Sequence, residues 1–166
     1  FNMNGRVRKG RKMRKRLIIG MSGASGAPLT IELLKQLQQY KEIIETHLIV
    51  TKGAEMTLEQ ETDYTLEQLY AFADEVHDNY NIGAGPASGS YRTMGMIVIP
   101  CSMKTLAGIV SGYSDNLVLR AADITLKERR KKISLPENGL SRYGNLSNNR
   151  CLCWQEYIMI IWKRNS

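Results

Sequence analysis

Three short segments of small and hydroxyl-bearing residues carry most of the chemistry that this sequence offers. They occupy residues 22–26 (Ser-Gly-Ala-Ser-Gly), 51–53 (Thr-Lys-Gly) and 101–105 (Cys-Ser-Met-Lys-Thr), and each follows an apolar run. In the first segment the glycines let the backbone approach an anion closely, and Pro28 indicates that a helix begins there. Unpaired N–H groups and the macrodipole at a helix start favour negative charge. The pattern therefore predicts a phosphate-bearing ligand.

The sequence lacks the motifs that bind dinucleotides and nucleoside triphosphates, and this narrows the class of phosphate ligand that we expect. The turn between Gly20 and Gly26 does not have the glycine spacing of the dinucleotide fingerprint. The second apolar run ends in Thr51 and Lys52, where an acidic ribose ligand would be expected. The phosphate-binding loop of nucleoside triphosphatases is also absent. A mononucleotide such as FMN fits this pattern better than a dinucleotide or a triphosphate.

The elements that must position these segments alternate along the chain. Short apolar runs are typical of buried parallel strands, and they occur at 16–20, 46–51 and 95–100. Helical spacing and cap residues predict helices that follow Pro28 and that cover 66–73, 103–110 and 115–130, the last with Asp115 as N-cap. This alternation indicates a three-layer α/β fold, a Rossmann-like or flavodoxin-like parallel sheet with helices on both faces. Ligands of such sheets bind beyond the carboxyl ends of the strands.

Charge is divided unevenly along the chain. Residues 1–16 carry eight Arg and Lys side chains and no acid, whereas residues 17–132 carry eleven basic and fourteen acidic side chains. The net charge of +7 thus belongs to a basic leader, residues 1–15, which we expect to be disordered, with translation normally starting at Met13. No nucleic-acid partner is expected, because the domain is acidic and has few aromatic residues for base stacking. No apolar run approaches the ~20 residues of a membrane span, and the expected location is cytoplasmic.

Six segments in register resemble one family, the UbiX-type flavin prenyltransferases, also described as small subunits of aromatic-acid decarboxylase systems. They lie within residues 13–132, at 21–27 (Met-Ser-Gly-Ala-Ser-Gly-Ala), 61–63, 86–90 (Pro-Ala-Ser-Gly-Ser), 100–107, 112–117 and 120–130. The resemblance implies a homo-oligomeric enzyme that joins a dimethylallyl group from dimethylallyl phosphate to N5 and C6 of reduced FMN. The prenylated FMN would serve a partner UbiD-type decarboxylase. No metal is implied, and His47 and His77 stand isolated in the sequence.

Carried over position by position, the resemblance assigns FMN contacts to the three segments and to one arginine. The cofactor-binding positions are Gly23, Ala24, Ser25, Thr51, Ser102, Met103, Lys104, Thr105 and Arg120. The candidate catalytic residues are Ser25, Glu61 and Lys127. Ser25 would lie near the reactive edge of the flavin, Glu61 would help it manage protons, and Lys127 would stabilise the phosphate that leaves the donor. Each also has a plain structural interpretation as a turn residue, a helix cap or a solvated charge.

The resemblance ends after Lys132. We therefore expect an FMN-binding domain over 16–132 and an atypical tail over 133–166. Where the family has a Pro-Arg-Glu segment, this chain has Pro136-Glu137-Asn138, and the later His-Leu-x-Asn-Met helix and donor-phosphate ligands are missing. Our hypothesis is that a change of reading frame near 131–132 replaced the C-terminal part. The apolar run at 157–162 is typical of an edge strand or of an aggregation-prone segment.

Three other functions compete with flavin prenylation. The first is a truncated, catalytically impaired FMN-binding remnant of the same family, which the tail favours. The second is an FMN-dependent cysteine-type decarboxylase. The motif at 86–90 argues against it, because those enzymes carry a Pro-Ala-Ser-Ala-Asn-type motif there. A nucleic-acid binder that acts through the basic leader comes last.

Overall fold

The computed structural model describes residues 13–136; the tail at 137–166, with its apolar run, and most of the leader lie outside the described residues. The strands in this part are β1 (Lys15–Met21), β2 (Ile44–Val50), β3 (Glu75–Asp78), β4 (Gly95–Cys101) and β5 (Lys131–Pro136). The helices are α1 (Ala27–Leu37), α2 (Lys52–Glu61), α3 (Leu66–Tyr70), α4 (Met103–Ser111) and α5 (Leu117–Lys127), with 3-10 turns η1 (Gln38–Tyr40) and η2 (Gly85–Ala87).

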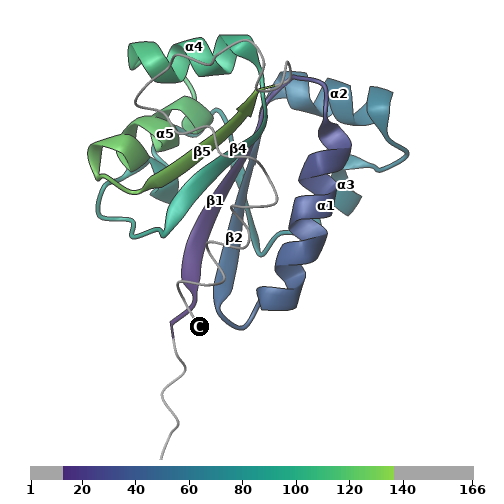
Figure 1. The fold of residues 1–166 in the computed structure, drawn as a ribbon, viewed down its shortest axis with the longest axis horizontal. Helices are drawn as coiled ribbons and strands as arrows, with labels where there is room; N and C mark the ends of the chain where they lie inside the picture. The colour runs from purple at the N-terminus through teal and green to yellow at the C-terminus, as the bar shows by residue number, and fades with distance from the viewer. Residues whose placement is uncertain (1–12, 137–166) are drawn as a thin grey trace, which may run out of the picture.

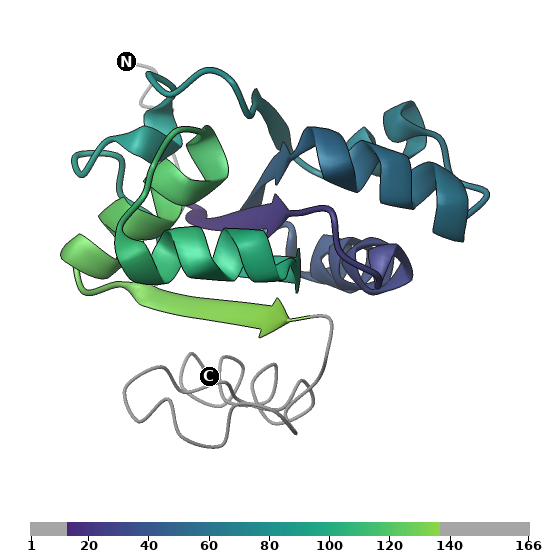
Figure 2. The same ribbon diagram turned by 90° about the horizontal axis from the view of Figure 1, so that it is seen from above.

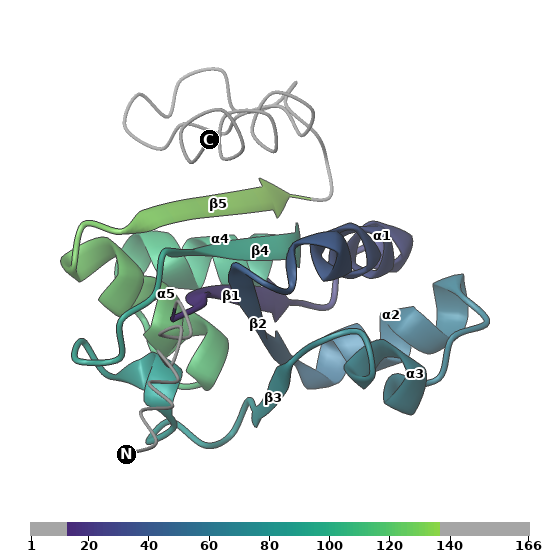
Figure 3. The same ribbon diagram turned by 90° about the horizontal axis from the view of Figure 1, so that it is seen from below.

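All five strands run parallel in one sheet, in the order β3-β2-β1-β4-β5 (Figure 3). β1 is central, since Ile19 pairs with Leu48 of β2 on one side and with Ile97 of β4 on the other. The chain thus builds outward from β1 to β3, then crosses to the other side of β1 to form β4 and β5. This is the Rossmann-type order, and the switch between β1 and β4 is where such sheets bind ligands.

Helices cover both faces of the sheet, which confirms the predicted three layers (Figures 1 and 2). One face presents Leu17 and Ile19 of β1 to a core shared with α1, α2 and α3. The other presents Ile18 of β1 and Val98 of β4 to a core shared with α4 and α5. Because side chains on both faces of the central strands are buried, these strands read as continuous apolar runs and not as alternating ones.

Two helix caps differ from expectation. Asn116, and not Asp115, is the N-cap of α5, because its side-chain oxygen accepts a hydrogen bond from the N–H of Leu119 at 3.0 Å. Thr51 was expected to end the second strand. It instead caps α2, where its hydroxyl accepts from the N–H of Ala54 at 3.2 Å. Threonine and asparagine are both favoured N-cap residues, so each can lie just before a helix.

Two element ends also differ from expectation. The helix expected over 66–73 ends at Tyr70. At the other edge of the sheet, β5 continues to Pro136, beyond the domain boundary expected at Lys132. No helix among residues 13–136 is both long and apolar enough to cross a membrane.

Candidate functional site

Two loops at the carboxyl edge of the sheet touch through glycine backbones. Gly23 follows β1, and Gly53 lies in the first turn of α2, just after β2. A Cβ added to Gly23 would lie 2.8 Å from both the Cα and the carbonyl carbon of Gly53, closer than real Cβ atoms approach backbone. The N–H of Thr51 donates to the carbonyl oxygen of Met21 at 3.0 Å and fixes the same pair of loops. Only glycine at position 23 permits this approach.

Ser22 ties the loop after β1 to the loop after β4. Its hydroxyl donates to the carbonyl oxygen of Pro100 at 2.9 Å and accepts from the N–H of Ser102 at 2.7 Å. The side chain is almost fully buried, at 1% exposure, so both bonds form away from water. The three segments predicted from the sequence therefore converge at one edge of the sheet. We call residues 22–26, 51–53 and 101–105 the cradle.

Three helices begin at the cradle. α1 starts after Gly26, which has a left-handed φ of 117° and no side-chain cap. α2 starts after Thr51, and α4 starts after Ser102, whose hydroxyl accepts from the N–H of Thr105 at 3.2 Å. Helix starts concentrate N–H groups and the positive end of the macrodipole, so the cradle is a favourable place for negative charge.

Glu61 already occupies one of these helix starts. Its carboxylate accepts hydrogen bonds from the N–H groups of Gly26 and Ala27, both at 2.9 Å. The Gly26 N–H and the Ser25 hydroxyl, together with the Ala27 N–H, hold the pKa of the Glu61 carboxyl below its usual value. The structure thus brings Ser25 and Glu61 together. It also places a carboxylate of the chain itself where a ligand phosphate was expected at α1.

The other predicted cofactor-binding residues lie on α4 and α5 or are buried in the cradle. Met103, Lys104 and Thr105 form the first turn of α4, with Lys104 exposed and Thr105 buried. Ala24 is buried at 2% exposure. Arg120 lies one turn into α5, and its side chain is exposed.

Lys127 lies at the opposite end of the sheet from the cradle. It is the last residue of α5, and the chain then turns into β5, whose first residue Lys131 pairs with Gly95, the first residue of β4. In the same turn, Arg130 donates to the carbonyl oxygen of Gly89 at 2.7 Å. Within one copy of the chain, Lys127 is therefore not brought to Ser25.

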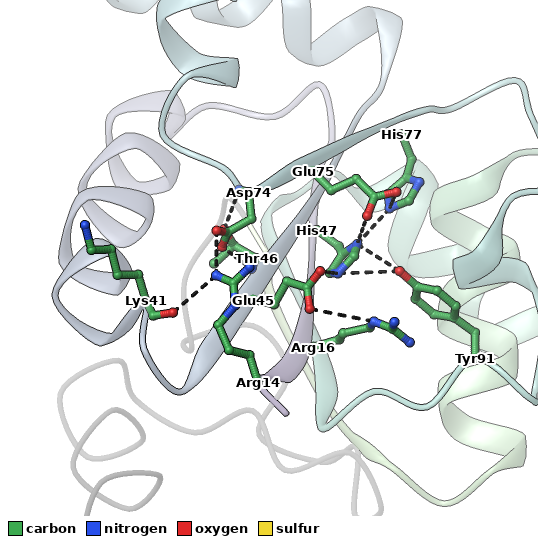
Figure 4. Close-up of polar contacts among 10 residues, drawn as sticks. All are labelled: Arg14, Arg16, Lys41, Glu45, Thr46, His47, Asp74, Glu75, His77 and Tyr91. Atoms are coloured by element: carbon green, nitrogen blue, oxygen red, sulfur yellow. Dashed lines mark hydrogen bonds and ion pairs between the residues drawn. The ribbon is translucent and has the colours of Figure 1, made fainter. Parts of the chain in front are cut away.

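A second polar group, which sequence reasoning missed, lies on β2 and β3 (Figure 4). His47 and His77 were expected to be isolated, and that expectation is wrong: His47 Nδ1 lies 2.9 Å from His77 Nε2. Glu45, Glu75 and the hydroxyl of Tyr91 lie around the pair. The available signal was one histidine, His47, on one strand and Glu75 and His77, two residues apart, on the next. It indicates a cluster only when the pairing register of the two strands is known.

Comparisons with known proteins agree with the fold. A model of the flavoprotein family matches residues 6–150. A probable UbiX-like flavin prenyltransferase of Sedimentibacter hydroxybenzoicus is 52% identical over 121 residues, which cover 73% of this chain and 64% of the relative. The chain thus spans less than two thirds of the length of that relative.

Two solved structures are similar over most of the described fold. AnUbiX (PadA1), crystallised with FMN and dimethylallyl pyrophosphate, matches with a TM-score of 0.74 and 46% identity over 78% of this chain and 69% of that one. A dodecameric FMN-dependent UbiX-like decarboxylase from Escherichia coli O157:H7 matches with a TM-score of 0.73 and 44% identity over 89% of this chain and 75% of that one. The chain belongs to the flavoprotein family and, within it, to the UbiX-type flavin prenyltransferases.

Proposed function

We propose that the chain is a flavin prenyltransferase that joins a dimethylallyl group to N5 and C6 of reduced FMN, with the phosphate of the dimethylallyl donor as leaving group. The observation that carries the proposal is the cradle, where three strand-end loops converge at the switch point between β1 and β4. The similarity to AnUbiX, which was solved with FMN and dimethylallyl pyrophosphate, supports FMN and a phosphorylated dimethylallyl donor here.

The cradle residues fit a phosphorylated flavin. Gly23 is exposed and has no side chain, and the Ala24 side chain is buried, so a flat ring system would meet no bulky group there. At the start of α4, N–H groups and the hydroxyls of Ser102 and Thr105 suit a phosphate, and exposed Lys104 adds positive charge. The bound flavin would supply the two atoms that are prenylated, and these residues would hold and orient it.

Ser25 and Glu61 would act as a pair. Glu61 remains ionised at neutral pH because the N–H groups of Gly26 and Ala27 and the Ser25 hydroxyl lower the pKa of its carboxyl. An ionised carboxylate accepts a hydrogen bond and fixes the hydroxyl that donates it, so Glu61 would orient Ser25. Ser25 would then present its oxygen lone pairs toward the reacting edge of the flavin.

Arg120 and Lys127 would each contact a phosphate group, but they lie toward opposite edges of the sheet in one copy of the chain. Arg120 belongs to the first half of α5, whose N-terminus lies at the carboxyl edge of the sheet beside Asn79. Lys127 lies at the amino edge, so its contact with the donor phosphate would require a second copy of the chain. The dodecameric assembly of the Escherichia coli O157:H7 relative supports a homo-oligomer here. A UbiD-type decarboxylase as recipient of the product remains a prediction from the resemblance, and a cytoplasmic location remains a prediction from the sequence.

A second candidate function is FMN binding without transfer. The sequence after Lys132 favours it, because Glu137 and Asn138 stand where the resemblance implies an arginine and an acid. A negative charge at that position would repel the donor phosphate. The two candidates share the cradle and differ only in the fate of the bound flavin.

One assay separates the candidates. Purified protein is mixed under anaerobic conditions with reduced FMN and dimethylallyl phosphate, and the flavin is analysed by mass spectrometry for an added five-carbon unit. We expect the added mass, and we expect Ser25→Ala to lower its rate of formation more than FMN affinity. Ser111→Ala is the matched control, since Ser111 lies at the far end of α4 and, within residues 13–136, its hydroxyl donates to the local carbonyl oxygen of Gly108. Bound but unmodified FMN would establish the second candidate, and absence of FMN binding would overturn both.

A further inference from the structure

The histidine cluster, which we define as His47, Glu75 and His77, is assembled by strand register. His47 of β2 pairs with Glu75 of β3, and Ile49 pairs with His77. Side chains two residues apart on a strand point to the same face, so the three side chains share the face of the sheet that α4 and α5 cover. Figure 4 shows the three side chains directed toward one another.

The ligand atoms of the cluster lie near the spacing that a small cation requires. His47 Nδ1 lies 2.9 Å from His77 Nε2 and 3.4 Å from Glu75 Oε2, and His77 Nε2 lies 3.6 Å from Glu75 Oε1. A tetrahedral ion with bonds of ~2.0–2.1 Å holds its ligand atoms about 3.3–3.4 Å apart. With a single oxygen taken from Glu75, the three ligand atoms lie within 4.8 Å of one another. Rotation of the half-exposed Glu75 side chain would bring them to the spacing that an ion requires.

The two imidazole nitrogens cannot both present lone pairs to each other at 2.9 Å. The ring centroids lie 5.2 Å apart, so the rings meet edge to edge with the two nitrogens between them. Either a proton or a cation must lie in that gap, because two facing lone pairs repel. A metal ion that binds there would release this proton to solvent.

Two groups lie beside the ring nitrogens of His47: the Tyr91 hydroxyl lies 3.1 Å from Nδ1, and the carboxylate of Glu45 lies beside Nε2. The Oε1 atom of Glu45 lies 3.5 Å from Nε2 of His47, which places a carboxylate on the ring nitrogen that faces away from His77. A histidine that ligates a metal typically donates its other ring N–H to a carboxylate in this way. A metal ion at Nδ1 of His47 would displace the Tyr91 hydroxyl from that nitrogen, and the N–H at Nε2 would then face Glu45.

The charges around the cluster favour a cation. Glu45 and Glu75 supply two negative charges, and Arg16, which lies 3.9 Å from Glu45 and stacks on the Tyr91 ring, supplies one positive charge. His47 is fully buried, whereas the Glu75 side chain is 51% exposed and gives solvent a route to the cluster.

We propose that His47, Glu75 and His77 bind a divalent transition-metal ion of the zinc type. Two imidazoles and one carboxylate suit Zn²⁺, Co²⁺ or Ni²⁺ and do not suit Mg²⁺ or Ca²⁺, which prefer oxygen ligands. Three protein ligands leave one position for water, on the side where Glu75 is exposed. The ion would link edge strand β3 to β2. Because it would bind the folded chain and not the unfolded one, it would stabilise that edge of the sheet by mass action.

The test is a Zn²⁺ titration of the full chain with Cys151→Ser and Cys153→Ser, which removes the two thiols of the tail. The chain has only two histidines, and both are in the cluster, so the histidine NMR signals report this site alone. We expect one Zn²⁺ per chain and movement of both histidine signals on binding. Co²⁺ in place of Zn²⁺ should give the visible absorption of a tetrahedral site.

Two variants make the result decisive. Glu75→Gln removes one ligand at a half-exposed position and should keep the fold while weakening Zn²⁺ binding by at least about tenfold. Glu67→Gln changes an exposed acid on α3 and should leave Zn²⁺ binding unchanged. The proposal is overturned if the histidine signals do not move at saturating Zn²⁺, or if Glu75→Gln binds Zn²⁺ as tightly as the parent. In either case a shared proton, and not a metal, holds the histidine pair.

Discussion

The cradle and the histidine cluster both depend on β2, yet their residues meet for different reasons. Cradle residues follow directly after β1, β2 and β4, and parallel strands bring their carboxyl ends to one edge whatever the exact register. Cluster residues lie within β2 and β3, and they meet only because His47 pairs with Glu75. A shift of one residue would turn one set of side chains to the other face of the sheet. A site at strand ends is therefore set by topology, and a site within strands is set by register.

The two regions also differ in what holds them. Backbone contacts between Gly23 and Gly53 and the buried hydroxyl of Ser22 join the cradle loops. Side-chain pairs join β2 to β3 and to the segment that precedes β3, with Asp74 bound to Arg14 and Thr46 (Figure 4). The cradle should therefore tolerate added atoms poorly, whereas the second region should tolerate changes that keep shape and hydrogen bonds.

The largest effect is expected from Gly23→Ala. The new Cβ would meet the Gly53 backbone at 2.8 Å and force the two cradle loops apart. We expect a loss of about 1–3 kcal/mol in the free energy of unfolding and a large loss of FMN affinity, measured by urea denaturation and flavin titration. Gly83→Ala is the control, because its Cβ would lie 3.6 Å from the side-chain oxygen of Asn81 and should be tolerated. If the two variants had equal stability and equal FMN affinity, the backbone contact between Gly23 and Gly53 would not be what holds the cradle loops together.

Ser22→Ala should cost about 2 kcal/mol in the free energy of unfolding. The change leaves the buried N–H of Ser102 without its acceptor and removes one donor to Pro100. FMN affinity should fall as well, since the same bonds hold the loop after β4. Urea unfolding with a flavin titration measures both, and the Ser111→Ala control should change neither. A stable Ser22→Ala variant that still loses FMN would place Ser22 in direct contact with the flavin.

Asp74→Ala tests the side-chain region and should cost about 1–2 kcal/mol in the free energy of unfolding. Its carboxylate accepts from Arg14 at 2.7 Å and from the buried N–H and hydroxyl of Thr46 at 2.8 and 3.0 Å. Asp74→Asn keeps an acceptor and the shape, so it should cost less. FMN affinity should be unchanged in both variants, which separates this region from the cradle in the same titration.

The free energy of unfolding should depend on pH through the ionisation of the Asp74 carboxyl. Burial would raise the pKa of its carboxyl, but hydrogen bonds from Arg14 and Thr46 outweigh burial and lower it below the usual 3.8. The stabilisation is therefore complete above that unfolded value and is lost as the pH falls through the lower folded value. Asp74→Asn should flatten the acid limb of a plot of unfolding free energy against pH. An unchanged limb would show that the Arg14 pair does not form in solution.

Glu61→Gln should have the smallest effect, about 0.5–1 kcal/mol in the free energy of unfolding. The amide oxygen can still accept from Gly26 and Ala27, and water screens the exposed charge that is lost. Because the pKa of Glu61 is lowered from 4.5, its stabilisation is complete above that value and is lost as the pH falls below it. Acid denaturation measures this, with Glu59→Gln as the neighbouring control. If prenyl transfer falls far more than stability, Glu61 acts on Ser25 as well as on the helix start.

The parts of the fold that the sequence did not predict have weak local signals. α2 buries only Ala54 and Leu58, so its apolar pattern is too sparse to mark a helix. β3 is an edge strand of four residues with mostly exposed side chains, and it has no apolar run. β4 was predicted because both of its faces are buried and each of its residues is apolar. β1 and β2 were predicted from the apolar runs that end them.

The sequence alone predicted the flavoprotein fold and the three cradle segments, because apolar runs, glycines and cap residues act locally. Once the strands are parallel, the loops after them must lie at one edge of the sheet. Tertiary structure alone placed Glu61 on the start of α1, Lys127 at the far end of the sheet, and His47 beside His77. These residues are distant in the sequence, and their contacts depend on helix direction and strand register, which arise only when the whole sheet packs.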